Sequence, residues 1–412
     1  MPTRATDTII PIDGVSHETY DWMPRAPEMH SRAEVLRQTG PYDAIVTAPI
    51  LDWDPQISSS VSADVEDATR ELVAFDRHAR SRLGTDNPAL GPMTAILLRT
   101  ESASSSQIEQ LTTSAKQLAL AEIDEGDKAN AVTVIGNVRA MEAALRLSDD
   151  ISEDSILAMH KALMLHQRGF EQDAGRYRSE QVWIGPGEAG PRLAEFVAPH
   201  HDRIPGAIAD LVGFVKRQDI SVLVQVAVAH AQFETIHPFP DGNGRTGRAL
   251  AQSILRNKGL VASTAVPISA GLLVDTDRYF AALTTFRSGD AGPIVSEFAS
   301  ASRIAAATGT RLVDDLVAQL EDSRQKMNGL RSDAAAWKVL PVLVGQPAMN
   351  TKYLMSTLGL GEMTALRALD ALADRGVLTE STGKSRNRVW QHRGIFDVLD
   401  GYAETIRRMS AR

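Results

Sequence analysis

The sequence predicts a mainly α-helical protein with one small β-hairpin and a mixed segment at its C-terminal end. Apolar residues recur at helical spacing in most segments, as Ile156, Met159 and Leu163 do. Strand-like patterns are confined to residues 181–197 and 376–391. The 412 residues exceed what one core ordinarily holds, so we expect two or three domains.

The N-terminal part is expected to be an arm, residues 1–94. Within it, residues 1–60 carry several prolines and no sustained pattern, so we expect them to be irregular. A helical pattern follows over residues 63–82. We place the main domain at residues 95–310 and a helical linker at residues 311–334.

The main domain is predicted to be all-α apart from its hairpin. Ser152 begins a helix, because its hydroxyl can accept a free backbone N–H and the acidic residues after it favour a helix N-terminus. Residues 181–197 form a strand, turn, strand pattern around a Gly- and Pro-rich tip. Further helices are expected over residues 205–217, 220–236, 244–258, 275–286, 293–307 and 316–331.

The C-terminal segment, residues 335–412, is predicted to be a winged helix. Three helical patterns, at residues 335–344, 350–358 and 362–375, precede two strand patterns. The segment holds eleven Lys and Arg against seven Asp and Glu, whereas the whole chain has a net charge of −9. If this segment binds DNA, its wing would carry Lys384, Arg386, Arg388 and Arg393.

Composition excludes several classes of function. The chain has no cysteine, which removes disulfides, thiolate metal sites and cysteine nucleophiles. The negative net charge argues against a surface built wholly for nucleic acid. The first thirty residues lack the apolar core of a signal peptide, and no segment is apolar enough to span a bilayer. We therefore expect a cytoplasmic protein without a membrane partner.

Residues 237–248, with the sequence HPFPDGNGRTGR, carry the strongest functional signal. Residues 242–247 also satisfy G-x-G-x-x-G, but a dinucleotide site needs a preceding strand and an acidic residue about 20 positions later. Here the loop follows a helical pattern, and residues 261–274 contain no acid. The glycine–lysine–Ser/Thr element of a P-loop is missing as well.

The loop is nevertheless suited to phosphate, because it leads into a helix N-terminus with unpaired N–H groups. Arg245 and Arg248 are three residues apart and emerge from one face of the first turn. Asp241 stands beside them, and a carboxylate next to bound phosphate is a usual ligand of Mg²⁺. His237 can accept a proton near neutral pH.

These residues resemble the signature of Fic domain proteins, H-x-F-x-[DE]-G-N-G-R-x-x-R, at all eight fixed positions. The resemblance extends over roughly residues 95–300, through the Gly-Arg-Tyr-Arg sequence at residues 175–178 and through residues 229–236. It implies an all-α Fic core that moves AMP from ATP, with Mg²⁺, to a Ser, Thr or Tyr hydroxyl of a target protein.

The resemblance also implies a role for each residue of the loop. His237 would deprotonate the hydroxyl, Asp241 would hold Mg²⁺, and Asn243 with the loop amides would form the anion hole. The two arginines would bind the β and γ phosphates, and Phe239 would anchor the loop in the core. The ATP-binding residues would then be Phe239, Gly242, Asn243, Gly244, Arg245, Thr246, Gly247, Arg248 and Tyr279.

The resemblance also implies roles for the hairpin and for Tyr279. The hairpin would be a flap that pairs with an extended target segment through Val182, Trp183 and Ile184. Tyr279 would line the adenine pocket, with packing in the core as an equal alternative. By contrast, residues 200–202, His-His-Asp, are expected on a loop surface, because adjacent histidines rarely converge on one metal.

Residues 105–110, SSQIEQ, resemble the inhibitory motif [ST]-x-x-x-E-[GN] that many Fic proteins carry before the core. The resemblance implies that a helix at residues 100–112 carries Ser105 and Glu109, and that Glu109 pairs with Arg248 and denies it to ATP. Gln110 departs from the motif, which has glycine or asparagine there.

The sequence therefore predicts an autoinhibited protein adenylyltransferase whose target protein is unknown. One alternative is removal of AMP or transfer of another part of a nucleotide. Another alternative is a DNA-binding regulator in which the core senses nucleotide. A homodimer is a further partner to consider, and DNA binding through the winged helix is less favoured than protein binding.

Overall fold

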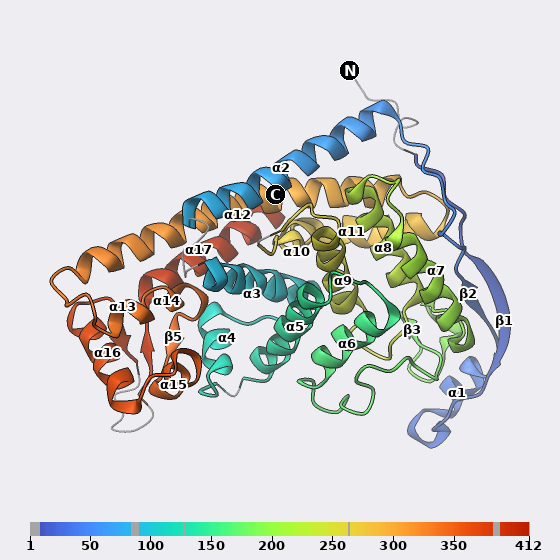
Figure 1. The fold of residues 1–412 in the computed structure, drawn as a ribbon. Coiled ribbons are helices and arrows are strands. Elements are labelled where there is room, and N and C mark those ends of the chain that lie inside the picture. Colours follow the sequence, from blue (N-terminus) through green and yellow to red (C-terminus); the bar gives the residue numbers. More distant parts are fainter. Residues whose placement is uncertain (1–8, 84–89, 127, 263, 382–387, 412) are drawn as a thin grey trace. The chain divides into compact units, whose positions relative to one another are not determined.

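The computed structural model describes residues 9–83, 90–126, 128–262, 264–381 and 388–411, and these are mainly helical (Figure 1). The predicted fold class is therefore confirmed. The chain divides into two compact units, each assembled from segments far apart in the sequence. The first unit comprises Met1–Asp67, Ala143–Lys258 and Asp277–Ala299, and the second comprises Ala68–Glu142, Gly259–Thr276 and Ser300–Arg412.

The first unit begins with a two-stranded antiparallel sheet. It consists of β1 (Ser16–Trp22) and β2 (Gly40–Val46), with α1 (Arg32–Gln38) between them. The prediction of an irregular arm is wrong for these residues. Alternate side chains of β1, those of Glu18, Tyr20 and Trp22, are the more buried ones, which is the period-two pattern of a strand with one face covered.

The helices of the first unit follow the predicted order. They are α6 (Glu153–Met164), α7 (Ile204–Lys216), α8 (Val222–Ile236), α9 (Asn243–Asn257), α11 (Thr276–Arg287) and the start of α12 (Gly292–Lys326). Ser152 caps α6 by accepting a hydrogen bond from the amide of Ser155, as the sequence predicts. The predicted hairpin forms between β3 (Trp183–Ile184) and β4 (Phe196–Val197).

The core of this unit lies around α8, which is buried on all sides. Helices α8 and α9 pack side by side (Figure 1). They approach closely at Gly247, where an added Cβ would lie 3.0 Å from a ring carbon of Phe233. The two helices that flank the motif are thereby held against each other.

The second unit is built on long helices. It contains α3 (Leu90–Ile108), α4 (Ala115–Glu122) and the short α10 (Ile268–Leu272), with most of α2 (Ser59–Leu83), α5 (Ala129–Arg146) and α12. The sequence predicts a helix over residues 293–307 and a connecting helix over residues 316–331. The structure joins them in α12, because no proline interrupts the pattern between them. Gly309 lies within the helix, and a Cβ there would be 2.8 Å from a ring carbon of Phe75.

The C-terminal segment contains the three predicted helical regions. They are α13 (Ala336–Val339) with α14 (Val342–Gly345), α15 (Thr351–Leu358) and α16 (Glu362–Asp374). Strands β5 (Ala348–Met349), β7 (Trp390–Gln391) and β6 (Thr379–Glu380) form an antiparallel sheet in that order. Strand β5 and the final helix α17 (Arg393–Ser410) were not expected from the sequence.

The basic residues expected on the wing have different positions. Lys384 and Arg386 lie outside the described residues. Arg388 pairs with Glu380 at 2.7 Å and with Asp370 at 3.2 Å. Its guanidinium also lies 4.4 Å from the ring centroid of Trp390. Arg388 is thus already paired within its own unit.

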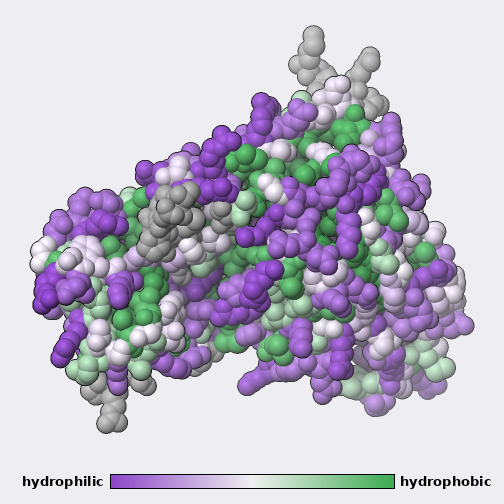
Figure 2. Space-filling view, in the orientation of Figure 1, coloured by the Kyte–Doolittle hydropathy of each residue, from purple (hydrophilic) through white to green (hydrophobic). Residues whose placement is uncertain are grey.

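Figure 2 shows hydrophilic residues spread over the face in view, with hydrophobic ones scattered among them. In the part of the chain that the structure describes, none of the helices has the length and apolar character needed to cross a membrane.

Candidate active site

The motif loop begins where α8 ends. His237 has φ 49° and ψ 59°, in the left-handed region, and Pro238 after it cannot continue the helix. The loop ends at Gly242, whose φ of 77° also requires the left-handed region. A Cβ at Gly242 would lie 2.5 Å from Cε of Met164, so that side chain of α6 would have to move to admit any other residue.

Helix α9 then presents its N-terminus to the loop. Its first intrahelical hydrogen bond runs from the amide of Thr246 to the carbonyl of Gly242 at 3.0 Å. The amides of Asn243 and Gly244 precede this bond, at positions where an α-helix offers no carbonyl acceptor. Such amides, together with the helix dipole, are suited to an anion, and binding of phosphate there stays a prediction.

His237 is oriented as a proton acceptor. Its Nδ1 lies 3.3 Å from the carbonyl oxygen of Glu234, and a carbonyl only accepts, so Nδ1 carries the proton. The lone pair of the neutral ring is therefore on Nε2. The edge of the ring meets Phe196 of the hairpin, with the centroids 5.9 Å apart.

Phe239 anchors the loop in the core, because its side chain is fully buried. The side chain of Asn243 closes the turn around it: the amide of Phe239 donates to Oδ1 of Asn243, and Nδ2 of Asn243 donates to the carbonyl of Phe239, both at 2.9 Å. One hydrogen of Nδ2 is used in this way, and Asn243 is itself buried. Asn243 thus shapes the loop in addition to any contact with an anion.

Asp241 lies at the edge of the anion site in a small polar network. Its Oδ1 accepts from the amide of Gly242 at 2.7 Å, and its Oδ2 lies 3.4 Å from Nη2 of Arg245. Gln167 donates to the same Oδ2 and accepts from Arg245 at 2.9 Å. The side chain of Asp241 remains 38% exposed, so its carboxylate faces solvent where a cation could reach it.

His160 of α6 supports the loop from behind, a role the sequence did not reveal. Its Nδ1 accepts from the amide of Gly175 at 3.1 Å, so its Nε2 donates to the carbonyl of Asp241 at 3.1 Å. Burial lowers the pKa of His160 to about 4, and the ring is neutral at pH 7. A neutral ring is the form that this donor and acceptor pattern needs.

Arg178 is a second residue whose role could not be predicted from the sequence, although it belongs to the Gly-Arg-Tyr-Arg sequence at residues 175–178. Its Nε donates to the carbonyl of His237 at 2.9 Å, and its amide donates to that of Pro238 at 3.0 Å. Its other nitrogens reach the carbonyls of Glu180 and Pro199, which flank the hairpin. Burial lowers the pKa of Arg178 to about 10, so it stays charged at pH 7.

The hairpin is fastened by the N-terminal sheet. Trp22 donates to the carbonyl of Ala189 at 2.8 Å, and the buried Gln38 accepts from the amide of Arg192 at 3.1 Å. The guanidinium of Arg192 donates to the carbonyls of Thr39 and Pro41. Among the strands that the structure describes, β3 pairs with β4 alone, which leaves its other edge for a partner strand.

Tyr279 is fully buried, and its hydroxyl lies 2.7 Å from Nε2 of His230. Burial, together with the charge of Arg248, lowers the pKa of His230 to about 3. Arg248 is buried as well. The structure therefore places Tyr279 in the core beside α8, which is the packing alternative considered for it, and its contact with adenine stays a prediction.

The predicted inhibitory motif lies in the second unit, at the end of α3. Ser105 is buried, and Glu109 is exposed in the turn that follows Ile108. Gln110 has φ 62°, a conformation that glycine and asparagine adopt with least strain. This gives a physical reason for the glycine or asparagine of the motif. The Glu109–Arg248 pair joins residues of two different units and stays a prediction.

The histidines after the hairpin differ from expectation. Ligand atoms of His200, His201 and Asp202 lie within 4.8 Å of one another, so these adjacent side chains do converge. His200 stacks on Tyr20, with the ring centroids 4.5 Å apart. Carboxylate oxygens of Asp202 lie 3.3 Å from Nδ1 of His200 and 3.5 Å from Nε2 of His201. Burial lowers the pKa of His200, which disfavours the charged ring that an ion pair with Asp202 would need.

Comparison with known proteins agrees with this geometry. Residues 150–255 match the model of the Fic/DOC family. The chain is 30% identical over 171 residues to a probable protein adenylyltransferase of Aquifex aeolicus, which covers 40% of this chain and 50% of that protein. It is 29% identical over 170 residues to the protein adenylyltransferase fic-1 of Caenorhabditis elegans, and this match covers 38% of this chain and 30% of that protein. The chain thus spans half or less of these curated relatives.

A solved structure extends the likeness of fold. A Fic family protein from Desulfovibrio desulfuricans G20 superposes with a TM-score of 0.50 at 24% identity, over 84% of this chain and 98% of that one. At this identity the likeness concerns the fold. It agrees with the match of residues 150–255 to the Fic/DOC family, and that region carries the complete loop motif on its α8–α9 support.

Proposed function

We propose that this chain is a protein adenylyltransferase, which moves AMP from ATP to a hydroxyl group of a protein. The observation that carries the proposal is the orientation of His237, whose Nδ1 is fixed as donor to Glu234. His237 would then be the proton acceptor at one end of the loop, and the N-terminus of α9 at the other end would bind phosphate. The names of the curated relatives support the same reaction.

In the proposed reaction the target hydroxyl oxygen attacks the α-phosphorus of ATP. Its proton passes to Nε2 of His237, a bond forms between the hydroxyl oxygen and the phosphorus, and the bond to the bridging oxygen of the β-phosphate breaks. Pyrophosphate leaves, and the target carries AMP. The amides of Asn243 and Gly244 would stabilise the charge that develops on the phosphate.

The two arginines of α9 would hold the leaving group. Arg245 is aligned by Gln167 at 2.9 Å, and Arg248 projects from the next turn of the same helix. Both are buried, so their charges act in a medium where attraction to phosphate is stronger than in water. Their contribution is to position ATP and to stabilise charge.

Asp241 fits the requirements of Mg²⁺. It offers a partly exposed carboxylate beside the anion site, and Mg²⁺ usually takes one or two carboxylates together with phosphate oxygens and waters. Bound there, the ion would neutralise part of the negative charge of the polyphosphate. Gly242 and Gln167 would hold the carboxylate in place through the hydrogen bonds they already donate.

The flap would present the target. The outer edge of β3, at Trp183 and Ile184, would pair with an extended segment of the target, and Val182 would continue that edge. The hydroxyl to be modified would then be drawn toward His237, whose ring touches Phe196 of the same hairpin. Inhibition by Glu109 would withdraw Arg248 from ATP and keep the resting activity low.

The test is transfer of label from α-labelled ATP to the chain itself, with intact mass to identify the group added. Wild-type protein with Mg²⁺ should gain the mass of one AMP, and His237→Ala should gain none. His17→Ala, at an exposed position of β1 in the same unit, is the matched control and should label normally. Label from γ-labelled ATP should not be transferred. Normal labelling of His237→Ala would overturn the assignment of the base.

A further inference from the structure

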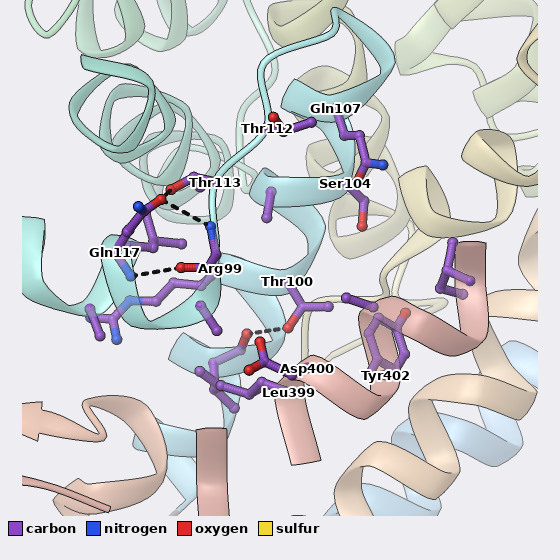
Figure 3. Close-up of a pocket in the computed structure, with 18 of the residues that line it drawn as sticks. Arg99, Thr100, Ser104, Gln107, Thr112, Thr113, Gln117, Leu399, Asp400 and Tyr402 are labelled. Carbon is purple, nitrogen blue, oxygen red and sulfur yellow. Dashed lines mark hydrogen bonds between the residues drawn. The ribbon is translucent and has the colours of Figure 1, made fainter. Parts of the chain in front are cut away.

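Helix α3 is held by neighbours on two faces. On one face, Glu101 accepts hydrogen bonds from the amide and hydroxyl of Ser269 at 2.9 and 2.6 Å. On another, Asn137 of α5 donates to the carbonyl of Ser102 at 2.9 Å and lies 3.1 Å from the hydroxyl of Ser106. The remaining face borders a cavity of about 510 Å³ (Figure 3).

The cavity has three walls, all in the second unit. The first is α3, whose lining side chains recur every three or four residues and so share one face: Ile96, Arg99, Thr100, Ala103, Ser104 and Gln107. The second is the segment of residues 112–119, which includes the start of α4. The third is α17, from which Leu399, Asp400 and Tyr402 face α3 in Figure 3.

Arg99 gives the cavity a partly buried cation, with 11% of its side chain exposed, that is only partly neutralised. Its Nη1 donates to the carbonyl of Gly345, and its nearest carboxylate, that of Glu122, is 3.8 Å away. The same oxygen of Glu122 is held more closely by Arg139, at 2.5 Å. A guanidinium has five N–H donors, so Arg99 retains donors beyond these contacts.

The other charges of the lining leave the cavity positive. Asp400 and Arg407, both on α17, are the remaining charged side chains among the described lining residues. Together with Arg99 they amount to two cations and one anion. Hydroxyl and amide groups of Thr100, Ser104 and Gln117 alternate with apolar side chains, so the cavity has both hydrogen-bonding and apolar surface.

We propose that this cavity binds a small organic anion, in which a carboxylate, sulfonate or phosphate group is joined to an apolar ring. The anionic group would bind Arg99, and the ring would lie between α3 and α17. The volume supports this class of ligand, since sites for small molecules usually measure about 300–1,000 Å³.

Such a ligand would act on the predicted inhibitory segment. Helix α3 carries Ser105 and, directly after its end, Glu109. A molecule that contacts both α3 and α17 stabilises the arrangement in which it binds. The consequence for catalysis rests on the proposed function: bound ligand would strengthen inhibition and lower AMP transfer. The binding itself does not depend on that function.

The probe is 8-anilinonaphthalene-1-sulfonate, an apolar aromatic anion whose fluorescence rises when water is excluded. Titration of the full chain, by fluorescence and by calorimetry, should show one saturable site. N-phenyl-1-naphthylamine has the same rings without the sulfonate and should bind at least about tenfold more weakly, because it lacks the charge-assisted hydrogen bonds of Arg99.

Two variants locate the site. Ala403→Trp should fill the cavity from an exposed position of α17 and abolish saturable binding. Glu404→Trp adds the same ring at the next residue, which is exposed and outside the lining, and should bind like wild type. Arg99→Gln should weaken binding of the anionic probe and leave binding of the neutral probe unchanged. Circular dichroism checks that this variant keeps its fold.

Equal binding by Ala403→Trp and wild type would overturn the proposal, as would equal affinity for the charged and neutral probes. All titrations are repeated in His237→Ala, where AMP transfer is expected to be lost. Binding that persists there supports the site whatever the reaction is. Binding without any change in the wild-type labelling rate would contradict only the link to inhibition.

Discussion

The ring of His160 lies flat on that of Phe239, with centroids 3.6 Å apart and planes 4° from parallel. The same imidazole bonds the amide of Gly175 and the carbonyl of Asp241 with its two nitrogens. One side chain of α6 therefore fixes the buried anchor of the motif and the backbone of its metal-ligand candidate. His160 is a positioning residue, because it acts on the site through these two neighbours.

Replacing His160 with Phe should separate these two contributions. Phenylalanine keeps the stack on Phe239 but loses both hydrogen bonds, leaving the amide of Gly175 and the carbonyl of Asp241 unsatisfied. We expect a loss of about 1–3 kcal/mol in the free energy of unfolding. Self-labelling should slow by at least about tenfold, because the loop is less well positioned.

The measurement is urea unfolding together with the rate of transfer from α-labelled ATP. His17→Phe, which makes the same change at an exposed position of β1, is the control and should leave both quantities unchanged. A labelling rate equal to wild type in His160→Phe would show that these hydrogen bonds do not position the loop.

The buried histidines also predict how stability depends on pH. The pKa of His160 is lowered from 6.5 to about 4, and that of His230 from 6.5 to about 3. Below pH 6.5 these histidines are protonated in the unfolded chain but stay neutral in the folded chain. The free energy of unfolding therefore falls as the pH falls from 6.5 toward 4. At pH 5 each of the two histidines should lower the free energy of unfolding by about 2 kcal/mol.

Urea unfolding at pH 7 and pH 5 tests this expectation. Wild type should lose stability between the two, and His160→Phe should lose about 2 kcal/mol less, because one titrating group is gone. If the two proteins lose the same free energy, His160 is not held neutral by the fold.

Much of the site could be predicted because its signals are local. The proline after His237 ends one helix, and the glycine at position 242 begins the next, so the loop and its helices were found from neighbouring residues alone. The partners of that loop were not. His160, Gln167 and Arg178 lie 59 to 81 residues before the groups they bond, and nothing in a local pattern pairs them.

The N-terminal sheet was missed for a related reason. Strand β1 does alternate, with Glu18, Tyr20 and Trp22 on its more buried side, and that alternation was a usable signal. Its partner strand begins at Gly40, after a helix, so the sequence has no tight turn between the two strands that would predict their pairing. The surface that β1 covers includes Val197 and Trp183 of the hairpin, which only the fold brings near.

Replacing Gln110 should stabilise the protein against unfolding. It is held at φ 62°, which strains a residue with a Cβ by roughly 1 kcal/mol. Gln110→Gly should remove this strain at the cost of extra freedom in the unfolded chain, and Gln110→Asn should remove part of it without that cost. We expect both variants to unfold at higher urea concentration than wild type. Gln107→Asn, a matched change inside α3 before the turn, should not stabilise the protein.

Glu109→Gly tests the inhibitory role. If Glu109 withholds Arg248 from ATP, its removal should raise the labelling rate by at least about tenfold, the effect of releasing one charge-assisted contact. The double variant Glu109→Gly with His237→Ala should be inactive, which shows that the gain passes through the same site. Labelling that is unchanged by Glu109→Gly would end the inhibitory assignment. A fall in AMP already present on the chain would favour AMP removal instead.

Arg192 should control how firmly the flap is held. Its guanidinium donates to the backbone carbonyls of Arg37, Thr39 and Pro41, which tie the hairpin to the N-terminal sheet. Hydrogen bonds from a charged donor contribute about 1.5–3 kcal/mol each when buried and less when exposed, as here. Arg192→Ala should therefore lower the local opening free energy of the hairpin by roughly 1–3 kcal/mol.

Hydrogen–deuterium exchange measures this opening. In wild type the amide of Glu195 donates to the carbonyl of Ile184 at 3.0 Å, so its exchange reports on the flap. Exchange should be about 10- to 100-fold faster in Arg192→Ala, whereas the amides within α9 should be unaffected. Arg32→Ala, at an exposed position of α1, is the matched control. Unchanged exchange at Glu195 would show that the hairpin keeps its position without the N-terminal sheet, and that its own pairing of β3 with β4 is sufficient.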